Sequence, residues 1–166
     1  MSETQIMPAP GAWTLALSHG TLECREIEPT RRFYRDFLGL ETLRRGDMAI
    51  WFRCGGGWIV ASVCTGDRQV ALPIESRFCL DMATPEEVDA AHGAAVRLKD
   101  EFAIKEILPV EVDGPRRSFC LRDLDGNWWE ICYRPGRLFD DVFASAEAIA
   151  APAFQKGASD AARYHR

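Results

Sequence analysis

Histidine is scarce in this 166-residue chain, which contains three: His19, His92 and His165. Lysine is scarce too, because only three of the 20 basic residues are lysines and arginine supplies the rest. Any metal site or acid–base centre must therefore be built from very few imidazoles. The formal net charge of -5 leaves the chain without the positive excess on which nucleic-acid binding depends. We expect no nucleic-acid partner.

Long hydrophobic segments are also missing. No apolar run reaches the roughly 18 residues that a membrane-spanning helix needs, and no basic segment precedes an apolar one at the N-terminus. We therefore expect no membrane partner and a cytoplasmic location. The six cysteines include no C-x-x-C pair, and most lie in apolar, strand-like stretches. This pattern favours reduced core thiols over a disulfide framework or a zinc site.

The length suits one domain, and the pattern inside it occurs twice. Residues 1–13 read as a flexible lead-in, and residues 14–66 and 75–134 each follow the order strand, helix, strand, strand, strand. In the second copy, Thr84-Pro85-Glu86-Glu87 is a capping box with proline at the first helical position. A unit of this size cannot bury its sheet face alone, so the two copies should pack together.

Hydrophobic periodicity and turn residues place the individual elements. The predicted strands cover residues 13–26, 40–44, 48–54, 58–65, 77–82, 102–108, 118–121 and 127–133. Residues 135–166 are predicted to form a C-terminal helix and tail, because residues 139–150 carry apolar side chains at helical spacing and Pro152 follows them. These apolar side chains should pack against either the rest of this subunit or a partner subunit.

Three motifs resemble the vicinal oxygen chelate superfamily: the opening strand at residues 17–22, the helix at residues 31–40, and the ending at residues 121–131, which contains Asp125-Gly126-Asn127-Trp128-Trp129-Glu130. This superfamily includes glyoxalase I, extradiol ring-cleaving dioxygenases, fosfomycin resistance enzymes and metal-free bleomycin-binding proteins. The resemblance implies an α+β fold in which two βαβββ modules form a curled mixed sheet around a small-molecule cavity. The C-terminal helix follows these modules.

The resemblance also implies where a divalent metal would bind in the metal-dependent members. The first ligand position matches His19 and the last matches Glu130, whereas the second falls on Arg77, which repels a cation. A fourth-strand ligand would fall on Val60 or Ala61, neither of which binds metal. Iron, manganese, nickel or zinc suits an imidazole and a carboxylate, but two protein ligands hold such an ion poorly.

Other residues offer few ways to complete the site. Glu75 and Cys79 share strand parity with Arg77 and are conceivable substitutes. His92 lies on the apolar stripe of its helix and should sit between helix and sheet, and His165 would have to reach the site from the tail. Alternatively, an Arg77–Glu130 ion pair satisfies the carboxylate without a metal.

Two functions follow as alternatives. In the first, the chain is an enzyme resembling the glyoxalases and extradiol dioxygenases that acts on a small oxygen-rich or anionic substrate. Glu130 and Arg77 would then be catalytic residues, with His19 and Glu130 as metal ligands. In the second, it is a metal-free small-molecule or drug-sequestering protein of the bleomycin-resistance kind, with Arg77 and Glu130 orienting the ligand. The family also implies a homodimer, with residues 139–149 near the interface.

Overall fold

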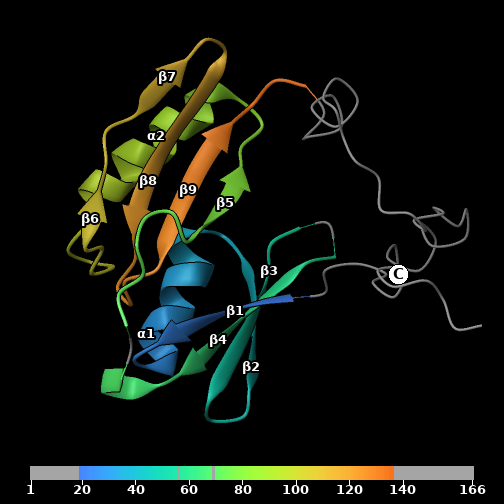
Figure 1. Ribbon diagram of the computed structural model, residues 1–166, viewed down its shortest axis with the longest axis vertical. Helices are drawn as coiled ribbons and strands as arrows, with labels where there is room; N and C mark the ends of the chain where they lie inside the picture. Colours follow the sequence, from blue (N-terminus) through green and yellow to red (C-terminus); the bar gives the residue numbers. More distant parts are fainter. Residues whose placement is uncertain (1–18, 56, 69, 137–166) are drawn as a thin grey trace, which may run out of the picture. The chain divides into compact units, whose positions relative to one another are not determined.

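The computed structural model describes residues 19–55, 57–68 and 70–136 (Figure 1). The lead-in expected over residues 1–13 and the helix expected over residues 139–150 lie outside this part of the chain. The homodimer contact assigned to that helix therefore stays a prediction. In the described ranges, no helix is long and apolar enough to cross a membrane.

The first copy of the repeat forms a four-stranded mixed sheet. Its strands run in the order β1-β4-β3-β2, with β1 and β4 parallel and the other neighbours antiparallel. The helix ends in a π-helical turn, η1, and a short 3-10 turn, η2, follows the last strand. The elements are β1 (His19–Cys24), α1 (Ile27–Arg32), η1 (Phe33–Phe37), β2 (Glu41–Arg45), β3 (Ala49–Arg53), β4 (Ile59–Cys64) and η2 (Gly66–Arg68).

The second copy repeats this arrangement in a five-stranded mixed sheet. Its order is β5-β9-β8-β6, with β5 and β9 parallel, and β7 pairs with β8 off this path. The elements are β5 (Arg77–Asp81), α2 (Pro85–Arg97), β6 (Glu106–Ile107), β7 (Glu111–Asp113), β8 (Arg116–Arg122) and β9 (Trp128–Tyr133). The predicted α+β fold of two βαβββ modules is therefore confirmed, and the described residues form no closed barrel.

Helix α2 begins where the sequence predicts and covers one face of the second sheet (Figure 1). The Thr84 hydroxyl accepts a hydrogen bond from the Glu87 backbone N–H, and the Glu87 carboxylate accepts one from the Thr84 N–H, which completes the capping box. Because strand side chains alternate between faces, this cover leaves every second residue of β5, β8 and β9 on the opposite, open face.

The strand predicted over residues 102–108 is wrong in its first half. Residues 98–103 form turns, in which the Phe102 N–H bonds the Leu98 carbonyl and the Ile104 N–H bonds the Lys99 carbonyl. Ala103 takes a positive φ of 51°, a left-handed conformation that breaks an extended strand. Phe102 and Ile104 are buried all the same, so their alternation imitates a strand without forming one.

A second difference lies in the hairpin that precedes β9. The sequence predicts a strand beginning at Ser118, whereas β8 begins at Arg116 and pairs with the unpredicted β7. Gly114, with a φ of 55°, provides the turn between them. This extension places Arg116 within the sheet.

Aromatic side chains join the two copies in one core. The Tyr34 ring lies 4.1 Å from that of Phe52 and 5.5 Å from that of Trp129, measured between ring centroids. All three side chains are essentially inaccessible to solvent. Because Tyr34 and Phe52 belong to the first copy and Trp129 to the second, neither copy has this core without the other.

The turn before β9 adds a buried carboxylate to this junction. Oδ1 of Asp123 accepts hydrogen bonds from the backbone N–H groups of Asp125 and Asn127, each at 2.9 Å. Oδ2 accepts from the Tyr34 hydroxyl at 3.0 Å, the Trp129 indole at 3.1 Å and the Asn127 amide at 3.3 Å. Burial, reinforced by the Asp125 charge, raises the pKa of Asp123 to about 6.

Asp125 ties the same turn to the first copy. Its carboxylate accepts hydrogen bonds from the Thr30 hydroxyl at 2.5 Å and the Arg25 backbone N–H at 2.8 Å. The turn at residues 123–127 is therefore structural, since internal donors occupy the carboxylates of both Asp123 and Asp125.

Candidate anion site around Glu130

Glu130 lies in the middle of β9, opposite Cys79 on β5 and Cys120 on β8. Its neighbours Trp129 and Ile131 point into the core beneath α2, so alternation places Glu130 on the open face of the second sheet. The residue is nevertheless only 4% exposed. A buried carboxylate of this kind needs partners, because an unpaired charge is costly away from water.

Arginines from three segments supply those partners. Arg77 Nε lies 2.9 Å from Oε2, and Arg116 Nη2 lies 2.5 Å from Oε1. Arg134 Nη2 is 4.0 Å from Oε1. Burial acts to raise the pKa of Glu130, but the hydrogen bonds from Arg77 and Arg116 outweigh it and hold that pKa below its usual value. Glu130 is therefore an ionised carboxylate enclosed by guanidinium groups.

Arg77 and Arg116 line a small pocket that opens beside Glu130. The pocket has a volume of about 130 Å³, and its wall includes Arg77, Arg116, Glu130 and the exposed Glu111. The Arg77 and Arg116 side chains are 36% and 37% exposed. Arg77 donates one further hydrogen bond, to the Ile74 carbonyl at 3.2 Å. Since a guanidinium carries five N–H donors, both arginines retain donors for an additional acceptor.

His19 occupies the corresponding place in the first sheet. It is the first residue of β1, as Arg77 is the first residue of β5. The two strands approach each other closely, because a Cβ atom added to Gly20 would lie 2.9 Å from the Phe78 ring. His19 is exposed and lies opposite Ile59. Its role as a metal ligand stays a prediction.

The registers of the two sheets also show whether Val60 or Ala61 occupies the fourth-strand ligand position implied by the family. Glu130 lies opposite Cys79, two residues after Arg77, and Ala61 lies opposite Thr21, two residues after His19. Ala61 is therefore the counterpart of Glu130, and it offers no ligand atom.

The residues at the family's ligand positions do not fit a divalent metal. Both oxygens of Glu130 accept hydrogen bonds from guanidinium groups, and Arg77 adds a fixed positive charge where a second ligand would stand. Among the described residues, no group of three potential ligands within bonding reach contains His19 or Glu130. The Arg77–Glu130 ion pair, the metal-free alternative from the sequence, is present.

The other histidine within the described ranges lies where the sequence places it. His92 belongs to α2 and meets the Phe119 ring edge-on, with ring centroids 5.0 Å apart. Phe119 points beneath α2, so His92 lies on the covered side of the sheet and away from Glu130. His165 falls outside the described residues.

A larger crevice lies on the covered side of the second sheet. It has a volume of about 380 Å³ and an apolar wall that includes Phe37, Leu40, Phe119 and Ile131. Apolar walls suit a small organic molecule, but no cluster of guanidinium groups converges on this crevice as it does on Glu130. The pocket beside Glu130 is therefore the stronger site for an anion.

The family follows from a sequence match that spans most of the chain. Residues 16–131 match the model of the Glyoxalase/Bleomycin resistance protein/Dioxygenase superfamily. The chain belongs to this superfamily. A comparison with curated proteins found no match.

Solved structures share this fold. Lactoylglutathione lyase from Agrobacterium tumefaciens has a TM-score of 0.55 and 20% identity over 72% of this chain and 94% of its own. The fosfomycin resistance protein FosX from Listeria monocytogenes has a TM-score of 0.60 and 23% identity over 76% and 94%. A variant of the same FosX was solved with Mn(II) and 1S,2S-dihydroxypropylphosphonic acid. The neighbours in fold thus include an enzyme, lactoylglutathione lyase, and a protein solved with Mn(II).

The sequence identified Glu130 and Arg77 but missed Arg116 and Arg134. Arg116 was missed because β8 was expected to begin two residues later. Strand alternation could have revealed it. Every second residue of a strand lies on the same face, so Arg116 shares a face with Ser118 and Cys120, and Cys120 lies opposite Glu130. Arg134 carries the same signal, being four residues after Glu130.

Proposed function

We propose that this superfamily member binds a small, oxygen-rich organic anion on the open face of its second sheet, without a metal at the Glu130 position. Arg77 and Arg116 hold the anionic group, and Glu130 fixes the two guanidinium groups in place. The observation that carries this proposal is the enclosure of the Glu130 carboxylate by Arg77 and Arg116 at 2.9 and 2.5 Å.

Guanidinium geometry supports an anionic ligand. Arginine presents a planar fork of donors that matches a carboxylate or a phosphonate, and it remains charged at every relevant pH. Glu130 already holds one donor of each fork, which lowers the entropy lost when a ligand binds the remaining donors. A FosX variant of similar fold was solved with Mn(II) and a dihydroxypropylphosphonic acid, which supports an organic anion as the class of ligand.

The proposal is tested by the affinity of phenylphosphonate for the wild type and for two arginine variants. Arg77→Met and Arg116→Met should each weaken binding by about tenfold or more, because a charge-assisted hydrogen bond contributes about 1.5–3 kcal/mol. Isothermal titration calorimetry measures the dissociation constants directly.

Arg117→Met is the matched control, because Arg117 neighbours Arg116 on β8 but pairs with Asp89 of α2. This variant should bind phenylphosphonate as the wild type does. Equal weakening by Arg116→Met and Arg117→Met, or no weakening by either Arg77→Met or Arg116→Met, contradicts the proposal.

A second candidate function is a metal-dependent enzyme of the glyoxalase or dioxygenase kind. The observation that favours it is the place of His19, which begins β1 as Arg77 begins β5 and matches the family's first ligand. This function requires Glu130 to exchange its arginine partners for a divalent ion, and it requires binding of that ion to depend on His19.

A further inference from the structure

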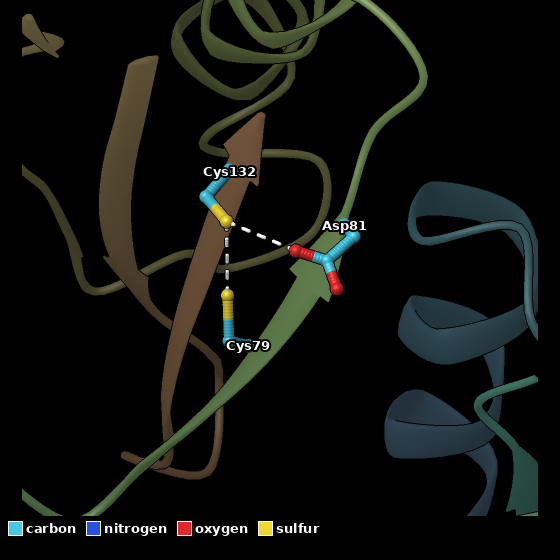
Figure 2. Close-up of side chains that lie close together, drawn as sticks. All are labelled: Cys79, Asp81 and Cys132. Carbon is cyan, nitrogen blue, oxygen red and sulfur yellow. Dashed lines mark hydrogen bonds between the residues drawn. The ribbon is translucent and has the colours of Figure 1, made fainter. Parts of the chain in front are cut away.

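Two cysteines and an aspartate converge on the open face of the second sheet. Figure 2 shows Cys79 and Asp81 reaching from β5 toward Cys132 of β9. The Sγ atoms of Cys79 and Cys132 are 3.3 Å apart, and Cys132 Sγ lies 3.2 Å from Oδ1 of Asp81. Their ligand atoms all lie within 4.8 Å of one another. Strand parity produces this convergence, because Cys79, Asp81 and Cys132 share the face of Glu130.

We propose that Cys79, Asp81 and Cys132 form a binding site for a thiophilic divalent metal ion such as zinc, with a fourth coordination position open to solvent. This site is separate from the ligand positions implied by the family, which fall on His19, Arg77 and Glu130. It also does not depend on the anion site proposed above.

The distances are close to those of a tetrahedral zinc site. With Zn–S bonds of about 2.3 Å and a Zn–O bond of about 2.1 Å, tetrahedral angles place two sulfurs about 3.8 Å apart. The same geometry places a sulfur and an oxygen about 3.6 Å apart. The observed separations of 3.3 and 3.2 Å need to open by about half an ångström or less, which side-chain rotation provides.

The ligand types select the metal. Thiolates are soft ligands that favour zinc over magnesium, calcium or manganese, and a single carboxylate is compatible with zinc. Three protein ligands and one open position are the coordination set of catalytic zinc sites. Cys79 and Asp81 are exposed, so solvent can reach that position.

The surrounding charges also permit a divalent ion. Two thiolates and a carboxylate carry three negative charges, which a divalent cation and one guanidinium together balance. Arg134 supplies that guanidinium, with Nη2 lying 3.4 Å from Cys79 Sγ. A hydrogen bond from Arg134 to a bound thiolate would orient it as outer partners orient ligands in other metal sites.

Strand geometry does not favour a disulfide between Cys79 and Cys132. Cys79 lies opposite Glu130 and Cys132 lies opposite Asp81, so the two cysteines are diagonal neighbours two residues apart in register. A strand spacing of about 4.8 Å and a rise of about 6.6 Å over two residues separate their Cα atoms by about 8 Å. That exceeds the roughly 7 Å beyond which a disulfide requires backbone movement.

The test is a titration of the full-length, reduced protein with Co(II), a spectroscopic substitute for zinc. The wild type should bind a single Co(II) ion per chain with thiolate-to-metal charge-transfer absorption, and Zn(II) should displace it. Cys79→Ser and Cys132→Ser should each weaken Co(II) binding by about 100-fold or more, because loss of a ligand costs more than loss of an outer partner. Asp81→Asn should weaken binding while retaining the charge-transfer band.

A control variant separates this site from the other thiols. Cys54→Ser, which alters a half-buried thiol of the first copy, should leave Co(II) binding unchanged. The proposal is overturned if the wild type shows no charge-transfer band, or if the band survives when both Cys79 and Cys132 are serine. A Cys79–Cys132 disulfide in the peptide map of protein purified without reductant would also overturn it.

Discussion

Replacement of Asp123 with alanine is expected to lower the free energy of unfolding by about 3–5 kcal/mol. The Asp123 carboxylate accepts five hydrogen bonds, including those of the fully buried Tyr34 and Trp129 side chains. Each buried donor left without an acceptor costs about 1–3 kcal/mol. Because these hydrogen bonds connect the two copies, we expect both copies to unfold in one transition. Urea denaturation followed by tryptophan fluorescence measures the change.

Asp113→Ala provides the comparison for this variant. Asp113 is an exposed residue of β7, and substitutions at such positions alter stability by about 0.5 kcal/mol or less. If Asp123→Ala costs no more than Asp113→Ala, the hydrogen bonds at the turn do not join the two copies as described.

Replacement of Glu130 with glutamine is expected to tighten the binding of phenylphosphonate by about tenfold to 100-fold. Glutamine keeps an acceptor oxygen that can hold a guanidinium group in place, but it removes the charge that competes with the ligand for Arg77 and Arg116 and repels an anion bound beside it. Two like charges about 5 Å apart repel by roughly 3 kcal/mol at the effective dielectric constant of a protein surface, before screening by salt. Calorimetric titration of the variant gives its dissociation constant.

This substitution separates the two candidate functions by the sign of its effect. If Glu130 is a metal ligand that presents a metal to the substrate, glutamine should weaken binding instead of tightening it. Glu111→Gln is the matched control, because Glu111 lines the same pocket but is exposed. Its effect on the dissociation constant should stay within about twofold, since solvent screens an exposed charge.

Much of the fold could be predicted from local patterns. The capping box at Thr84 fixed the start of α2, and the repeat of strand and helix signals predicted two matching modules. The turns around Ala103 could not be predicted, because Phe102 and Ile104 are buried at alternate positions whether the backbone is extended or turned. An alternating pattern of apolar residues indicates which side chains are buried, but here they are buried without forming a strand.

The candidate site was predictable only in part, because it depends on register. The Arg77–Glu130 pair followed from family positions, but Arg116 required the true start of β8 and its pairing with β9. The cysteine cluster illustrates the same point. Cys79 and Cys132 are 53 residues apart and form no C-x-x-C motif, so only the parallel pairing of β5 and β9 brings them together.

The metal dependence of phenylphosphonate binding distinguishes a metal-free anion site from a metal-dependent one. We predict that the wild type binds phenylphosphonate with the same dissociation constant in EDTA as in Mn(II), and that His19→Ala leaves this constant unchanged. Arg77→Met should weaken binding under both conditions. Binding that disappears in EDTA, returns with Mn(II) and is lost in His19→Ala would contradict a metal-free anion site at Glu130.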